Sequence, residues 1–207
     1  MISGARRLSL IIEFDEDDIE GLPKFRKKLN NYIIVKSLGK GSSSKVFLAV
    51  DSQTREKYAI KRMKLRDLIR TSNGIAQLQR EIDLMKKFHH TNIIKLYEVL
   101  YDKRDYYVYL VIEYAENGSL FRYIENNIQI PEISVCSIIK QISSALSSMH
   151  RIRYVHQDVK PGNILLCSDG RAILADFGIG HTFQSSTMVV GSPAYQAPEA
   201  LDDYSSS

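Results

Sequence analysis

The stretch Tyr154-Val-His-Gln-Asp-Val-Lys-Pro-Gly-Asn163, followed by Ala175-Asp-Phe-Gly178, decides the fold of this 207-residue chain. It sets two carboxylates, Asp158 and Asp176, and one amide, Asn163, on short loops between apolar runs. A buried carboxylate or amide is costly unless it is paired or bound to a metal, so packing alone explains these residues poorly. Two carboxylates and an amide favour a hard cation with oxygen ligands, such as Mg²⁺ holding phosphate.

Three motifs in a fixed order carry a resemblance to a known family. His156-Gln-Asp-Val-Lys-Pro-Gly-Asn163, Asp176-Phe-Gly178 and Ala197-Pro-Glu199 look like the catalytic loop, the metal-binding loop and the end of the activation segment of eukaryotic protein kinases. A single tripeptide is weak support. Several in the right order and spacing, with strand and helix patterns between them, are rarely a chance match. The resemblance covers residues 32–201.

The resemblance implies an α+β, protein-kinase-like bilobal fold. Its N-lobe is a small antiparallel sheet with one main helix, and its C-lobe is mostly helical. We expect a leader at 1–31, an N-lobe at 32–113 and an incomplete C-lobe at 114–207 that holds the hinge, the catalytic loop and the activation segment. The similarity ends shortly after Ala-Pro-Glu, so the chain resembles a kinase domain truncated there, without its remaining C-lobe helices.

The leader has no sustained periodicity, because basic, acidic and again basic residues follow one another along it. We expect partial disorder or a short helix in residues 1–31. A solvated tail is one interpretation, and a regulatory segment phosphorylated at Ser9 is the other.

Composition excludes several classes of protein. With 44% hydrophobic and 25% charged residues, the chain is typical of a soluble globular protein. Its net charge of +4 is mild and no basic face dominates, so we expect no nucleic-acid partner. No apolar run approaches about 18 residues, which excludes a membrane-spanning helix. Cys136 and Cys167 lie far apart in sequence and favour a reducing, cytoplasmic location.

Periodicity predicts the secondary structure in order. Alternation of apolar and polar residues predicts a strand at 32–38, and we interpret the stretches 46–50, 58–61, 95–100 and 106–113 as further strands. Helical spacing predicts helices at 77–88, 120–126 and 132–150, with a turn at 116–119. Short apolar runs at 152–155, 164–166 and 173–175 are strand-like or buried. The pair His89-His90 suggests a metal site at first sight, but adjacent histidines do not easily face one ion, so we interpret it as structural.

Gly39-Lys-Gly41 joins the first two strands as a hairpin, in which glycines let backbone N–H groups approach phosphate oxygens. A plain hairpin explains this motif equally well. The resemblance implies a glycine-rich loop over ATP, except that Ser44 stands where the family has a third glycine, which is tolerable if φ stays negative. The ATP-binding residues that the resemblance implies are Leu38, Gly39, Lys40, Gly41, Ser42, Ser43, Ser44, Lys45, Val46, Ala59, Lys61, Glu113, Ala115 and Leu165.

Lys61 follows an apolar strand run, and Glu81 sits beside the apolar face of helix 77–88. Each is ordinarily a solvated residue at a strand end or on a helix surface. The resemblance instead implies that the Lys61 ammonium holds the α- and β-phosphates and that Glu81 pairs with it. The break at Asn73-Gly74 precedes this helix and would let it swing.

The resemblance also assigns the chemistry. Asp158 orients the substrate hydroxyl and accepts its proton, and Lys160 contacts the transferred phosphoryl group, as in Ser/Thr kinases. Asn163 and Asp176 hold Mg²⁺. Ser192 stands where threonine is more frequent and still supplies a hydroxyl to Asp158.

Gln157 departs from the family, which commonly has an arginine before the catalytic aspartate. Glutamine cannot form a bidentate charged pair with phosphate. We therefore expect a weaker dependence on phosphorylation of the activation segment, although Ser185, Ser186 and Thr187 are available there.

These observations together predict an ATP-dependent protein serine/threonine kinase that uses ATP, Mg²⁺ and a protein substrate. The wording Ser192-Pro-Ala-Tyr-Gln196 resembles the calmodulin-dependent group and the kinases upstream of AMP-activated kinases. The alternative is a truncated, poorly active kinase-like module that binds nucleotide or a partner. Intact catalytic residues favour the first hypothesis. Missing helices favour the second, because uncovered apolar surface would invite a regulatory partner onto the C-lobe.

Overall fold

The computed structural model describes residues 6–7, 11–14, 26–41, 44–70, 73–102, 106–176, 181–182 and 192–196. The chain divides into two compact units, Met1–Arg80 with Lys95–Tyr114, and Glu81–Ile94 with Ala115–Ser207. The first unit thus ends one residue after the N-lobe that the sequence predicts. Within residues 81–94, the backbone of the last three residues pairs with the rest of the second unit: Ile94 N–H donates to the Leu174 carbonyl at 3.0 Å.

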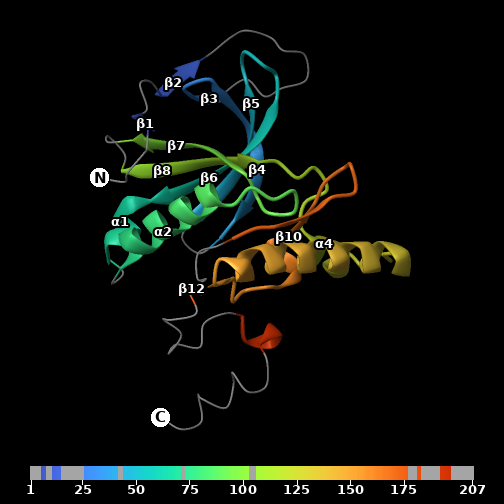
Figure 1. Cartoon of the computed structure of the whole chain (residues 1–207). Coiled ribbons are helices and arrows are strands. Elements are labelled where there is room, and N and C mark those ends of the chain that lie inside the picture. The colour runs from blue at the N-terminus through green and yellow to red at the C-terminus, as the bar shows by residue number, and fades with distance from the viewer. Residues whose placement is uncertain are drawn as a thin grey trace. The chain divides into compact units, whose positions relative to one another are not determined.

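An eight-stranded sheet forms most of the described part of the first unit, in the order β1-β7-β8-β6-β5-β4-β3-β2 (Figure 1). Neighbouring strands are antiparallel except β1 and β7, which are parallel. The strands are β1 (Arg6–Arg7), β2 (Ile11–Phe14), β3 (Arg26–Leu29), β4 (Tyr32–Lys40), β5 (Ser44–Asp51), β6 (Lys57–Lys64), β7 (Leu96–Asp102) and β8 (Tyr107–Glu113). All five predicted strands are therefore present.

The apolar residues of the central strands form one hydrophobic core. Ile60, Leu100 and Tyr109 are 0–1% exposed and pack in one cluster with Ala49 and Val111. Burying a side chain as large as isoleucine stabilises a fold by about 1.5–3 kcal/mol. A tyrosine ring from β4 joins the same cluster, because Tyr32 packs edge-on against the Tyr58 ring at 5.4 Å.

The described residues of the leader 1–31 form strands, and the short helix considered for it is not found among them. β3 pairs with β4 through Leu29 and Tyr32, and β1 pairs with β7 through Arg6 and Leu100. Leu29 is 1% exposed and belongs to the core cluster of the sheet. Sequence reasoning missed these strands because they are only two to four residues long and lie in a stretch rich in charged residues.

Helix α2 (Gly74–Lys87) confirms the helix predicted at 77–88, and the predicted face of Leu78, Ile82 and Met85 is buried. Asn73 precedes it with φ of 70°, a left-handed conformation that asparagine tolerates better than most residues. A second helix, α1 (Leu65–Arg70), was not predicted, because six residues are too few to show helical periodicity.

The described part of the second unit is built on helix α4 (Glu132–Arg151), against which the short hairpin of β10 and β11 lies (Figure 1). Ile142, Ala145 and Met149 form its buried stripe at helical spacing. The remaining elements are α3 (Leu120–Glu125), β9 (Tyr154–Val155), the 3-10 turn η1 (Pro161–Asn163), β10 (Ile164–Leu166), β11 (Ala172–Leu174), β12 (His181–Thr182) and the 3-10 turn η2 (Pro193–Tyr195). The predicted helices and the α+β class are confirmed.

The histidine pair has a structural role at His90, as predicted. Its Nδ1 accepts the Asn92 backbone N–H at 3.0 Å, which places the ring proton on Nε2, 3.2 Å from the Ser144 hydroxyl. Among the described residues, no group of three or more His, Cys, Asp and Glu side chains is placed to hold a metal ion. No helix in the described ranges is both long enough and apolar enough to span a bilayer.

Candidate active site

The catalytic loop runs from β9 to β10 and is short because one 3-10 turn closes it. Pro161 occupies the start of that turn, where its missing N–H costs nothing, and Asn163 N–H returns to the Lys160 carbonyl at 2.9 Å. The turn brings Asp158, Lys160 and Asn163 to one place. Asp158 and Asn163 are buried, with 8% and 7% of their surface exposed.

Both carboxylate oxygens of Asp158 are held. Oδ2 lies 2.7 Å from the Lys160 ammonium and accepts the Asn163 side-chain N–H at 2.8 Å. Oδ1 accepts the Ser192 hydroxyl at 2.9 Å and the Ser192 backbone N–H at 3.1 Å. Lys160 also donates to the Ser192 hydroxyl at 2.6 Å. The predicted hydroxyl supply from Ser192 to Asp158 is therefore confirmed.

These contacts determine the charge state of Asp158. Burial is the largest single effect and raises the pKa of the carboxyl group. Hydrogen bonds from Lys160, Ser192 and Asn163 oppose it, and together with the Lys160 charge they hold the pKa below its usual range. Asp158 is thus an ionised carboxylate at neutral pH, ready to accept a hydrogen bond and later a proton.

His156 is a second buried group of the loop, with 1% of its surface exposed. Its Nδ1 accepts the Asp158 backbone N–H at 3.3 Å, so the ring proton lies on Nε2, which donates to the Ala175 carbonyl at 3.1 Å. Burial lowers the pKa of the imidazole, which is therefore neutral at pH 7. The neutral ring therefore links the backbone of Asp158 to the backbone of Ala175, the residue that precedes Asp176.

The β10–β11 hairpin carries the two residues predicted to hold a metal. Asn163 directly precedes β10, and Asp176 follows β11 after one residue. Ala175 N–H donates to the Asn163 carbonyl at 2.9 Å, so Asp176 is next to a residue paired with Asn163. Both side-chain N–H groups of Asn163 go to Asp158, which leaves its Oδ1 as the remaining polar atom. An amide oxygen and a carboxylate fit Mg²⁺, whose other ligands are usually phosphate oxygens and water.

Backbone strain marks the same two loops. Gln157 has φ of 64° and Asp176 has φ of 67°, both in the left-handed region. Aspartate enters this region more easily than glutamine does. A glutamine held there stores of order 1 kcal/mol of strain, and such strain gathers at functional sites.

Three residues predicted to bind ATP share one face of the first unit's sheet. Val46 pairs with Lys61 across β5 and β6, and Ala59 lies two residues before Lys61 on the same strand. Directly paired residues and residues two apart point to the same face of a sheet. Leu38 and Lys40, with Gly39, lie at the end of β4, and Gly39 pairs with Val46.

A backbone hydrogen bond joins the two residues that flank the tip of the glycine-containing loop. Gly41 N–H donates to the Ser44 carbonyl at 2.9 Å. Ser44 and Lys45 begin strand β5, whose extended backbone has negative φ, so serine fits where the family has glycine. Ser42 and Ser43 lie outside the described residues.

The other predicted nucleotide residues are distributed over the two units. Glu113 ends β8, and its N–H donates to the Lys95 carbonyl at 2.9 Å. Ala115 is buried and starts the turn closed by Gly118 N–H at 3.2 Å. Leu165 lies on β10, and Glu81 is 7% exposed on α2. Whether Glu81 pairs with Lys61 stays a prediction.

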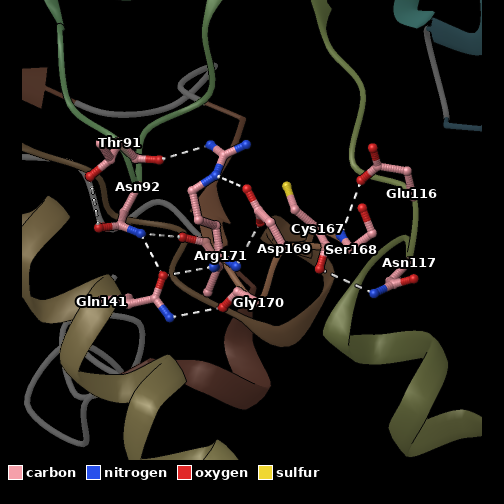
Figure 2. A network of polar contacts seen from close by, with 11 residues as sticks. Thr91, Asn92, Glu116, Asn117, Gln141, Cys167, Ser168, Asp169, Gly170 and Arg171 are labelled. Atoms are coloured by element: carbon pink, nitrogen blue, oxygen red, sulfur yellow. Dashed lines mark hydrogen bonds and ion pairs between the residues drawn. The ribbon is translucent and has the colours of Figure 1, made fainter.

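A polar network that the sequence did not reveal holds the turn of the β10–β11 hairpin (Figure 2). On one side, Asn117 donates to the Cys167 carbonyl at 3.1 Å and the Ser168 N–H donates to Glu116 at 3.1 Å. The backbone bonds of Glu116, from its own N–H and from Ser168, lower the pKa of its carboxyl group. On the other side, Asn92 and Gln141 reach the opposite edge of the hairpin.

A cavity of about 410 Å³ lies in the second unit, between α3, the first turns of α4 and this hairpin turn. Tyr123, Ile130 and Ile138 supply apolar walls, and Arg171 lies among its polar ones. None of the residues predicted for catalysis, for the metal or for ATP lines this cavity.

Comparison with known proteins gives one family and a large set of relatives. The model of the family described as protein kinase domain matches residues 32–207. A probable serine/threonine-protein kinase of Dictyostelium discoideum is 37% identical over 182 residues, which are 84% of this chain and 26% of that protein. The chain therefore spans about a quarter of the length of this curated relative.

Proposed function

This chain belongs to the protein kinase domain family, and we propose that it transfers the γ-phosphoryl group of ATP to serine and threonine hydroxyls of proteins. The observation that carries the proposal is the set of contacts on Asp158, whose two oxygens are held by Lys160, Asn163 and Ser192. A carboxylate fixed in this way has one orientation and stays ionised. The name of the 37% identical relative supports the preference for serine and threonine.

Asp158 acts as the base of the transfer. Its Oδ1 already accepts a hydroxyl group, that of Ser192, so the same edge is suited to orient a substrate hydroxyl. The substrate oxygen attacks the γ-phosphorus, the bond from that phosphorus to the bridging oxygen of ADP breaks, and Asp158 takes the hydroxyl proton. Lys160 lies 2.7 Å from the Asp158 carboxylate, so its ammonium is placed to stabilise the negative charge of the transferred phosphoryl group.

ATP and a divalent cation complete the site. The geometry of the hairpin supports Asn163 and Asp176 as the residues that hold Mg²⁺, and the bound ion would neutralise charge on the phosphates. Val46, Ala59 and Lys61 share a sheet face, which supports an apolar base site beside a phosphate-binding ammonium. In the proposed active state Glu81 pairs with Lys61.

The test is phosphoryl transfer from radiolabelled ATP to a mixed serine/threonine peptide library by the purified chain. Asp158→Asn keeps the shape of the side chain and removes its basicity, so transfer should fall by about 100-fold or more. Glu125→Gln, which removes one exposed negative charge on α3, should leave the rate unchanged. Equal signals from the wild type and Asp158→Asn would overturn the proposal.

The second candidate is a kinase-like module that binds nucleotide or a regulatory partner with little transfer. Exposed apolar side chains on α3 and α4 favour it: Ile124, Ile133 and Ile139 are 54%, 78% and 60% exposed. A partner that covers them would bury apolar surface at about 25 cal/mol per Å². Binding of Mg²⁺·ADP without any transfer would favour this candidate.

Gln157 supports activity without loop phosphorylation. Its amide carries no charge and cannot form the bidentate charged pair that an arginine makes with a phosphate, and its Oε1 is buried without a hydrogen-bond partner among the described residues. Ser185, Ser186 and Thr187 lie outside the described residues. The triple alanine variant should retain most of the transfer rate, and loss of activity in it would contradict this point.

Two finer assignments also rest on sequence. The segment Ser192–Gln196 supports the subgroup near calmodulin-dependent kinases, which peptide-library selectivity would test. No disulfide joins Cys136 and Cys167, which accords with a cytoplasmic location. Fractionation of cells that express the chain would test that location.

A further inference from the structure

The side chain of Gln141 uses its full hydrogen-bonding capacity at the edge of β11 (Figure 2). Its Oε1 accepts the Ala172 backbone N–H at 2.9 Å and the Asn92 side-chain N–H at 2.7 Å. Its Nε2 donates to the Gly170 carbonyl at 3.1 Å and to the Ser137 hydroxyl at 3.3 Å. An amide side chain has two donor hydrogens and two acceptor sites on its oxygen, so no capacity is left over.

Asn92 completes the arrangement from the other segment. It is 8% exposed, and its Nδ2 donates both to Gln141 and to the Ala172 carbonyl, the latter at 2.9 Å. Its Oδ1 accepts the Thr91 hydroxyl at 3.3 Å. Gln141 thus accepts the backbone N–H of Ala172, and Asn92 donates to the backbone carbonyl of the same residue.

The outer edge of β11 is fully paired as a result. Alternate residues of the strand, Ala172 and Leu174, direct their backbone groups away from β10. Leu174 N–H donates to the Asn92 carbonyl at 2.8 Å, and its own carbonyl accepts Ile94 N–H at 3.0 Å. The backbone of residues 92–94 therefore hydrogen-bonds to Leu174, and the two side-chain amides hydrogen-bond to Ala172. Together they replace the neighbouring strand that would otherwise pair with this edge of β11.

The position of this edge determines where the metal-holding residues lie. β10 and β11 have three residues each, and Asn163, just before β10, and Asp176, just after Ala175, both lie at the open end of this hairpin. A strand this short has few ladder bonds of its own, and a shift of one residue would turn every side chain to the other face. Anchoring Ala172 therefore anchors the segment that ends at Asp176.

We propose that Asn92 and Gln141 are positioning residues for the metal site: by capping the outer edge of β11 they fix the register of the hairpin and so the relation of Asn163 to Asp176. The inference rests on the proposed function, because it gives this hairpin the task of holding Mg²⁺ beside the nucleotide. Groups that orient metal ligands in this way typically change metal affinity by about 10- to 100-fold when they are removed.

Three variants separate positioning from simple loss of stability. Gln141→Leu removes all four side-chain hydrogen bonds at similar volume. Gln141→Glu keeps the two accepted bonds, including that from Ala172, and loses the donated ones. Ile142→Ala is the control, because Ile142 is the buried neighbour of Gln141 on α4 and the substitution weakens packing without removing an edge bond.

Two measurements on the full chain decide the inference. The first is backbone amide hydrogen exchange of residues 164–176 without nucleotide, which should quicken by about tenfold or more in Gln141→Leu beyond the change in global stability. The second is the Mg²⁺ concentration that gives half-saturation of ADP binding, which should rise by about tenfold. Gln141→Glu should shift less than Gln141→Leu, and Ile142→Ala should change neither quantity beyond its global stability.

Unchanged exchange in Gln141→Leu overturns the inference, and so does an equal Mg²⁺ shift in Ile142→Ala. The measurements use ADP binding instead of turnover, so the two proposals can fail separately. A wild-type chain that binds Mg²⁺·ADP but transfers no phosphoryl group overturns the proposed function, and the same titrations still decide the positioning role. A chain that binds no Mg²⁺·ADP overturns both.

Discussion

Strand β6 of the first unit has a hydrogen-bonded strand on each side, with seven paired residues toward β5 and seven toward β8. Strand β11 of the second unit has three residues and a single neighbouring strand, β10. Its other edge is paired by two side-chain amides and by the backbone of residues 92–94. The two regions reach the same end, a fully paired strand, by different means.

The difference shows where single residues matter. In the sheet, backbone hydrogen bonds fix how the strands pair, and buried apolar side chains such as Ile60 supply the stability. In the hairpin and the catalytic loop a few buried polar groups, such as Asp158 and Asn163, do both through specific hydrogen bonds. Loss of one partner there leaves another group unsatisfied, which costs about 1–3 kcal/mol for a neutral group and more for a charge.

The largest stability effect should come from the sheet. Ile60 is 0% exposed, so Ile60→Ala should lower the free energy of unfolding by about 2–5 kcal/mol through lost burial and a residual cavity. Ile139→Ala, at a position 60% exposed, should cost less than about 0.5 kcal/mol. Urea unfolding measures both. Similar costs for the two variants would break the comparison, because burial would not then govern the sheet.

A smaller effect, on chemistry instead of stability, should follow from Ser192→Ala. The variant removes the hydroxyl bond to Asp158 and keeps the backbone N–H bond. The pKa of Asp158 should rise, and the rate of phosphoryl transfer should fall by about tenfold, as expected for one hydrogen bond to a charged group.

The sign of the pH dependence follows from the direction of this shift. The pKa of Asp158 is lower in the folded chain than in the unfolded one, so this carboxylate stabilises the fold above its unfolded pKa and less as pH falls through the folded value. The acid limb of kcat/KM should therefore lie below the ordinary aspartate range in the wild type and move upward in Ser192→Ala. A limb at the same pH in both proteins would contradict the role given to Ser192.

The elements that repeat a simple period could be predicted, and those held by isolated polar contacts could not. Alternation located β4, strand-like stretches located β5 to β8, and the 3.6-residue period located α2 and α4. The motif spacing named Asp158, Lys160 and Asn163, which the structure brings together. The pairing of Gln141 with Ala172 has no period, because it joins residues 31 positions apart. A glutamine between Ile138 and Ile142 on an apolar helix face was its only visible signal.

The smallest predicted effect concerns the imidazole ring of His156, one of the buried polar groups of the catalytic loop. Burial lowers the pKa of His156, so at pH 6 its imidazole should be less charged than that of an exposed histidine. Its proton should lie on Nε2, because Nδ1 accepts the Asp158 backbone N–H. Long-range ¹H–¹⁵N NMR correlations report both the charge and the tautomer. An imidazole as charged at pH 6 as that of an exposed histidine, or a proton on Nδ1, would show that the ring is not held as described.

The most direct measurement of the central claim is paramagnetic broadening of backbone amide signals by Mn²⁺·ADP, with Mg²⁺·ADP as the diamagnetic reference. Mn²⁺ takes oxygen ligands as Mg²⁺ does and broadens signals of nearby nuclei. If Asn163 and Asp176 hold the ion, broadening should be strongest for residues 158–163 and 174–176, and Asn163→Ala should weaken it. Broadening centred elsewhere in the chain, or unchanged in Asn163→Ala, would contradict the account.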